Sequence, residues 1–174
     1  LEEARRLWRA VGRQNAMIKV PATQEGIPAI EELISEGINV HVTLVFGREI
    51  YERVANAYIA GLERFSAGGG DPSGVASVAS FFISWIDTAI DGIIAERLKT
   101  SASASDHVLL RGLVGKVAIA NAKLTYQSYL ELCSGARWQA LSGRGAQSQR
   151  LLWTSTSGKN PKYRDVLYVE ELIG

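Results

Sequence analysis

The sequence predicts an α/β fold built on a parallel sheet. Short apolar runs rich in β-branched residues alternate with longer runs of helical period along the whole chain. This alternation is typical of strands joined by helical crossovers. The 174 residues can bury one core but are too few for two domains of ordinary size. We therefore expect a single domain over residues 1–174.

Proline and glycine residues help to place the boundaries of the individual elements. Pro21 closes the first apolar run, and Gly37 ends the helical period that follows it. The glycine-rich stretch at 67–72 reads as a connection. The expected elements are, in order, a helix at 1–13, a strand at 16–20, a helix at 24–36, a strand at 38–46, a helix at 48–65, a strand within 75–84, helices at 86–98 and 106–132, and strands at 151–153 and 166–169.

Five strands of one kind fit two architectures. One is an open, doubly wound sheet, and the other is part of an eight-stranded α/β barrel. Periodicity alone does not separate them.

Composition excludes several classes of function. Nineteen Lys and Arg residues nearly cancel eighteen Asp and Glu residues, and this balance gives no reason to expect a nucleic-acid partner. The lone Cys133 cannot close an internal disulfide, and no apolar run is long enough to span a bilayer. His41 and His107 lack the spacing of a zinc site. We expect a cytoplasmic protein without membrane attachment or bound metal.

Lys19 is the first candidate for chemistry. It lies in an apolar run and is followed closely by Pro21. Burial at the end of a strand would disfavour its ammonium form and supply the free amine that imine formation requires. The alternative is an ion pair, or a side chain that reaches the surface.

Two polar residues, His41 and Thr43, share one face of the second expected strand, because side chains on a strand alternate between faces. Polar groups at alternate positions of a buried strand indicate a lined pocket, although paired core hydrogen bonds would give the same pattern.

The polar segment after the strand at 151–153 offers hydroxyls and a cation. Ser155, Ser157 and Lys159 suit a phosphate group, although a solvated loop explains them as well. Asp87 and Asp91 are four residues apart on a helix, which most often means a solvated face.

Four segments resemble the transaldolase family. MIKVPAT at 17–23, followed by GIPAI, is similar to the family's active-lysine segment on its fourth strand. GINVHVTLVF at 37–46 is similar to the fifth strand, and ASVASFFIS at 76–84 to the sixth. The tail over 152–174, with GKNP and LYVEELIG, resembles strands seven and eight of the longer transaldolases, including those fused to glucose-6-phosphate isomerase.

This resemblance implies a fold and a reaction. The fold is a partial TIM-type (β/α)8 barrel, class I aldolase-like, that lacks the first three strands. The Lys19 amine would condense with fructose 6-phosphate or sedoheptulose 7-phosphate. The resulting imine draws electrons while the C3–C4 bond breaks, and a dihydroxyacetone unit then passes to an aldose phosphate. No cofactor is expected.

Further roles carry over by position. The resemblance implies that Thr43 orients the catalytic water and that Ser80 lies close to the substrate. It places Ser155 near the phosphate, with Lys159 as the cation, or with Ser157 if the register shifts. His41 stands where the family usually has a substrate-binding asparagine, and imidazole can still donate or accept a hydrogen bond.

Two departures affect these expectations. Trp85 stands where the family has a phosphate-binding arginine, and tryptophan offers one neutral donor. The first three strands, with the family's acid/base aspartate and water-holding glutamate, would precede Leu1. We therefore expect an incomplete chain whose open strand edges can associate with another chain.

The expected function is transaldolase, in the pentose phosphate pathway, with sugar phosphates as substrates. Two alternatives stay open. One is a catalytically inactive incomplete barrel, or a barrel that a partner completes. The other is a related class I aldolase that releases free dihydroxyacetone.

Overall fold

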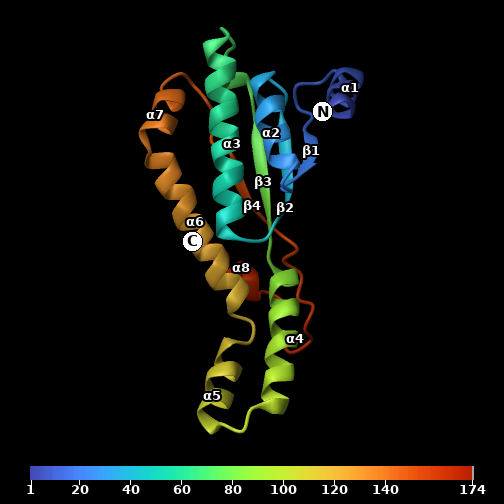
Figure 1. The fold of residues 1–174 in the computed structure, drawn as a ribbon, viewed down its shortest axis with the longest axis vertical. Helices are drawn as coiled ribbons and strands as arrows, with labels where there is room; N and C mark the ends of the chain where they lie inside the picture. The colour runs from blue at the N-terminus through green and yellow to red at the C-terminus, as the bar shows by residue number, and fades with distance from the viewer. Residues whose placement is uncertain (174) are drawn as a thin grey trace. The chain divides into compact units, whose positions relative to one another are not determined.

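A computed structural model describes residues 1–173 of the chain. The elements are α1 (Glu2–Val11), β1 (Ile18–Pro21), α2 (Gly26–Ser35), β2 (Val40–Val45), α3 (Arg48–Ala67), the short 3-10 helix η1 (Pro72–Gly74), β3 (Ser77–Phe82), α4 (Ser84–Thr100), α5 (Ala104–Leu113), α6 (Val117–Ser134), α7 (Ala136–Ser142), β4 (Arg150–Thr154) and α8 (Leu167–Leu172) (Figure 1). They fall into two compact units, described separately below. Unit 1 holds residues 1–81 and 125–152, and unit 2 holds residues 82–124 and 153–173.

The four strands form one sheet in the order β1-β2-β3-β4. β1 pairs with β2 in parallel, and β2 pairs with β3 in parallel. Helices α2 and α3 provide the crossovers between successive strands. The predicted α/β class with a parallel sheet is therefore confirmed, and the arrangement is consistent with part of a barrel.

The core of unit 1 lies between the sheet and its crossover helices. Val40 and Val42 of β2 are fully buried, as are Ile30 and Ile34 of α2. Helices α2 and α3 lie side by side over this face of the sheet (Figure 1). They approach closely at Gly61 of α3, where a Cβ atom would lie 2.7 Å from the Cβ of Ile34. A glycine at this position is what permits the close packing.

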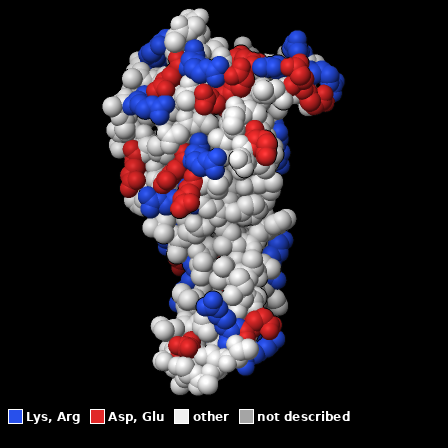
Figure 2. Space-filling model, in the orientation of Figure 1, with Lys and Arg blue, Asp and Glu red and all other residues white. Residues whose placement is uncertain are grey.

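The helices of unit 1 carry mixed charge on their outer side. On the face drawn in Figure 2, basic and acidic side chains are interspersed over these helices. Within unit 1, the ion pairs Arg64–Glu32 and Arg137–Glu63 join neighbouring helices, at 2.9 and 2.7 Å. This face shows no large area of a single sign that a nucleic acid would need. Among the helices of residues 1–173, none is long and apolar enough to cross a bilayer.

The structure corrects three of the expected elements. The helix expected at 106–132 is two helices, α5 and α6, because Gly115 adopts a positive φ of 69° between them. Residues 166–169 were expected to form a strand but begin helix α8, so the described sheet has four strands rather than five. Periodicity does not distinguish a strand from a buried helical turn in so short an apolar run. Helix α7 was not expected.

Unit 2 is held together around two carboxylates of α4. Asp87 is 1% exposed and accepts hydrogen bonds from the Ala118 backbone N–H at 2.9 Å and the Tyr168 hydroxyl at 2.8 Å. Asp91 accepts from the Gly115 N–H and the Tyr163 hydroxyl. The solvated face expected for this pair is therefore wrong for Asp87. The two carboxylates join α4 to the start of α6 and to the segment containing α8.

Candidate functional site

Lys19 lies on β1 between two buried residues. Ile18 and Val20 point into the core, whereas the Lys19 side chain is exposed. Of the two possibilities that the sequence leaves open for Lys19, the structure shows the one in which the side chain reaches the surface. The cause is the two-residue period of the strand, which directs Lys19 to the face opposite that of Ile18 and Val20.

His41 is the direct neighbour of Lys19 on the next strand. The parallel register of β1 and β2 pairs Lys19 with His41, so both side chains point to the same face of the sheet. Burial lowers the pKa of the His41 imidazole, and the positive charge of Lys19 lowers it further. The neutral imidazole is therefore favoured beside Lys19.

Ser80 of β3 completes this group. His41 Nε2 lies 2.6 Å from Ser80 Oγ, in a hydrogen bond whose donor depends on the tautomer of the ring. Ser80 is 4% exposed, so its hydroxyl is held in a largely dry position. The sequence-predicted residues Lys19, His41 and Ser80 thus come from three neighbouring strands and meet on one face of the sheet.

Thr43 lies two residues beyond His41, near the end of β2. It is 9% exposed, and its backbone carbonyl accepts a hydrogen bond from the Ala22 N–H at 2.8 Å. The register between β2 and β3 shifts immediately afterwards, between Val42 and Val45. Leu44, within this irregularity, has a positive φ of 60°, a conformation that is costly for a branched side chain. Bulges and backbone strain of this kind are common beside functional sites.

Sequence reasoning missed this irregularity and also missed Asn39, just before β2. The side chain of Asn39 donates to the backbone carbonyls of Gln14 and Ala16, and accepts from the Ala76 N–H. Asn39 is 3% exposed, so its amide ties the beginnings of three strands together inside the protein. The signal in the sequence that could have indicated this role is a polar residue, Asn39, directly before the apolar strand β2.

The second group of candidate residues lies in unit 2. Ser155 follows β4 with a positive φ of 54°, and its carbonyl accepts a hydrogen bond from the Ser84 N–H at 2.9 Å. Lys159 and Ser84 line a cavity of about 270 Å³, together with Thr88, Asp91, Asn160, Pro161, Tyr163 and Tyr168. The Ser84 hydroxyl is buried, without a hydrogen-bond partner among residues 1–173. This cavity brings a cation and a hydroxyl to the first turn of α4, whereas Ser157 does not line it.

Trp85 occupies the first turn of the same helix. Its side chain is 55% exposed and makes an edge-to-face contact with Phe82, with ring centroids 5.7 Å apart. At this position the side chain adds apolar surface and no charge. The first turn of α4 therefore depends on Lys159 for positive charge at the cavity.

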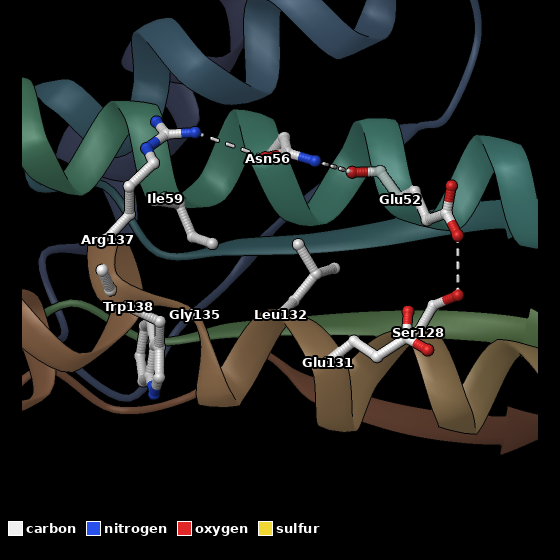
Figure 3. Close-up of a pocket in the computed structure, with 10 residues that line it drawn as sticks. Glu52, Asn56, Ile59, Ser128, Glu131, Leu132, Gly135, Arg137 and Trp138 are labelled. Atoms are coloured by element: carbon white, nitrogen blue, oxygen red, sulfur yellow. Dashed lines mark hydrogen bonds between the residues drawn. The ribbon is translucent and has the colours of Figure 1, made fainter.

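A larger hollow of about 490 Å³ lies elsewhere in unit 1, in the groove between α3 and the junction of α6 and α7 (Figure 3). Its polar side chains bind one another. Ser128 donates to Glu52 at 2.6 Å, and Arg137 donates to Asn56 at 3.3 Å. The Ser128 hydrogen bond is the main cause of the lowered pKa of Glu52. This groove contains none of the sequence-predicted residues, and its charges are already paired.

No group of three His, Cys, Asp or Glu side chains among residues 1–173 is arranged to hold a metal ion. The chemically useful groups are instead an amine, an imidazole and a hydroxyl on the sheet, and a cation with hydroxyls in unit 2. Such groups are suited to imine and proton-transfer chemistry on a polar substrate.

Comparison with known proteins gives a consistent assignment over the full chain. The chain is 55% identical over 174 residues to a transaldolase of Trichodesmium erythraeum and 52% identical over 175 aligned residues to transaldolase 2 of a Nostoc species. It is 49% identical over 173 residues to transaldolase 1 of Streptomyces avermitilis. These alignments cover 99–100% of the chain but only 44–46% of each relative, so the chain spans less than half of their length. The model of the transaldolase/fructose-6-phosphate aldolase family matches residues 1–174, and the chain therefore belongs to this family.

Proposed function

We propose that this chain carries the imine-forming part of a transaldolase. Lys19 attacks the ketone of a sugar phosphate, either fructose 6-phosphate or sedoheptulose 7-phosphate. The resulting imine accepts the electrons of the breaking C3–C4 bond, and a dihydroxyacetone unit is transferred to an aldose phosphate. The observation that carries this proposal is the pairing of Lys19 with His41 and Ser80 on one face of a parallel sheet.

The other site residues take supporting roles in this proposal. Thr43 orients the water that forms or hydrolyses the imine, from the end of the strand that carries His41. Ser155 and Lys159 bind the phosphate, since Lys159 lines a polar cavity at the first turn of α4. Helix N-termini favour anions because their N–H groups and dipole point outward. The reaction belongs to the pentose phosphate pathway, and we place it in the cytoplasm.

The test is chemical trapping in the protein at its full natural length. The protein is incubated with fructose 6-phosphate, reduced with borohydride and digested for mass spectrometry. We expect an adduct on the peptide that contains Lys19 and none in a Lys19→Arg variant, because arginine keeps the charge but forms no imine. Lys116→Arg, at an exposed lysine in unit 2, is the matched control and should keep the adduct. A folded protein without an adduct on Lys19 would refute the proposal.

Transfer and simple cleavage are distinguished by an acceptor. A transaldolase turns over only when an aldose phosphate such as erythrose 4-phosphate accepts the dihydroxyacetone unit and leaves as sedoheptulose 7-phosphate, whereas an aldolase releases free dihydroxyacetone without an acceptor. Product analysis with and without the acceptor therefore decides between these two activities of the family.

A second candidate is a chain that requires a partner polypeptide for activity. The observation that favours it is the open sheet of four described strands, in which the amine of Lys19 is exposed. An eight-stranded barrel closes on itself and has no free edge. Size-exclusion chromatography with light scattering tests this candidate, because it predicts that the 174-residue chain associates or gains trapping activity only with added partner.

A further inference from the structure

A groove in unit 2 combines cationic side chains with an apolar floor. It has a volume of about 470 Å³ and lies between the start of α6 and the segment at 162–171, which includes most of α8. All of its lining residues belong to unit 2. None of the residues assigned to the imine or to the sugar phosphate lines this groove, so the proposed reaction gives it no role.

Positive charge dominates the lining of the groove. Its cationic residues are Lys116, Lys123, Lys162 and Arg164, and its acidic residue is Glu171. Carboxylates of α8 already bind Lys123 and Arg164. The side chains of Lys116 and Lys162, in contrast, form no ion pair within residues 1–173. Two cations are therefore free to bind an anion from solution.

Apolar side chains form the floor between these cations. Ile119 is 7% exposed, and Val114 and Leu167 are half-buried. Small-molecule sites typically combine an apolar lining with a few polar groups and have volumes of roughly 300–1,000 Å³. An inorganic ion alone would leave the apolar floor in contact with water. The lining therefore fits an anion that carries an organic body.

The walls of the groove are fixed to one carboxylate of α4. The Tyr163 ring packs on Gly115, where a Cβ atom would lie 2.9 Å from Tyr163 Cζ, and the positive φ of 69° at Gly115 turns the chain into α6. Asp91 accepts hydrogen bonds from the Tyr163 hydroxyl and from the Gly115 N–H. Both sides of the groove are thus held in place by Asp91. A ligand that binds here has little of the wall to order, which favours affinity.

We propose that this groove binds a small organic polyphosphate. Lys116 and Lys162 bind the phosphate groups through charge-assisted hydrogen bonds. Val114, Ile119 and Leu167 contact the organic body. The inference goes beyond the proposed function and does not depend on it, because the groove is separate from the cavity at the first turn of α4.

Isothermal titration calorimetry of the protein at its full natural length tests the proposal, with ATP as the probe at low ionic strength and without Mg²⁺. Tripolyphosphate and adenosine serve as probes of the phosphates and of the organic body alone. We expect a single ATP to bind per chain, about tenfold or more tightly than either of these parts. Lys116→Gln and Lys162→Gln should each raise the Kd for ATP about tenfold or more, because each removes a charged donor. Both side chains are exposed, so the variants should keep the urea midpoint of the parent.

Two control variants show whether ATP occupies this groove. Lys99→Gln removes an exposed lysine of α4 that does not line the groove, and it should leave the Kd unchanged. Lys159→Gln should also leave it unchanged, because Lys159 lines the other cavity of unit 2. The proposal is overturned if ATP does not bind, if it binds no more tightly than tripolyphosphate, or if Lys159→Gln weakens it while the groove variants do not. Borohydride trapping on Lys19 tests the proposed function separately, so either idea can fail without the other.

Discussion

Removing the Tyr168 hydroxyl should destabilise unit 2 measurably. This hydroxyl donates to Asp87 at 2.8 Å, and Asp87 is 1% exposed, so solvent cannot replace the lost bond. Burial, followed by the hydrogen bond to Asp87, raises the pKa of Tyr168, so the phenol remains a donor across the physiological range. A hydrogen bond to a charged group contributes about 1.5–3 kcal/mol, and we expect Tyr168→Phe to cost about 2 kcal/mol of unfolding free energy.

Urea titration and amide hydrogen exchange together test this expectation. A loss of about 2 kcal/mol corresponds to a roughly 30-fold larger opening constant, which should appear in exchange of the α8 amides and of Ala118, the other donor to Asp87. Tyr126→Phe is the matched control because Tyr126 is 44% exposed, and surface changes of this kind stay within about 0.5 kcal/mol. Equal effects of the two substitutions would refute the reasoning.

Three further predictions concern packing, pH and phosphate binding. Gly61→Ala should lower the free energy of unfolding by about 1–3 kcal/mol, because the new Cβ would lie 2.7 Å from the Cβ of Ile34. Gly112→Ala is the control, since Gly112 of α5 faces open space, and it should be neutral or stabilising by up to about 1 kcal/mol. The urea midpoints of the two variants test this difference. The folded chain binds fewer protons at His41 than the unfolded chain, so stability should fall as pH drops below about 6.5 and level off below the lowered pKa. His41→Asn should remove this component from urea titrations at pH 5–8, and an unchanged pH dependence would contradict it. Trp85→Arg should lower the Km for fructose 6-phosphate about tenfold or more by adding a charged donor, and an unchanged Km would count against phosphate binding at this turn.

Much of the sheet could be predicted from sequence because its signals are local. The apolar runs around Lys19 and His41 contain the strands β1 and β2, and Gly37 separates α2 from the second strand. The C-terminal region was harder, because residues 166–169 form a short apolar run whose conformation depends on a distant partner. Tyr168 is placed by Asp87, and a contact between residues 81 positions apart leaves no local signal.

The candidate site, too, could be predicted only where neighbouring residues of one strand determine it, and not where it depends on the pairing of distant strands. Alternation along β2 predicted that His41 and Thr43 share a face, but it could not give the 2.6 Å hydrogen bond between His41 and Ser80, which depends on the pairing of β2 with β3. The sequence could not decide between burial and exposure of Lys19, because its apolar sequence neighbours lie on the opposite face. On a strand, the residues directly before and after a position point to the opposite face of the sheet, so they do not indicate the surroundings of the side chain between them.

One face of the sheet packs against the helices and contributes to stability, whereas the other face carries the candidate residues Lys19 and His41. Ile18, Val20, Val40 and Val42 face the helices, and shortening any of them would leave a cavity whose cost appears in the free energy of unfolding. Lys19 and His41 alternate with these residues on the same strands but face away from the core. Substitutions at Lys19 and His41 should therefore cost little in packing. The proposed imine chemistry therefore requires that Lys19→Arg loses activity while it retains the urea midpoint of the parent at neutral pH.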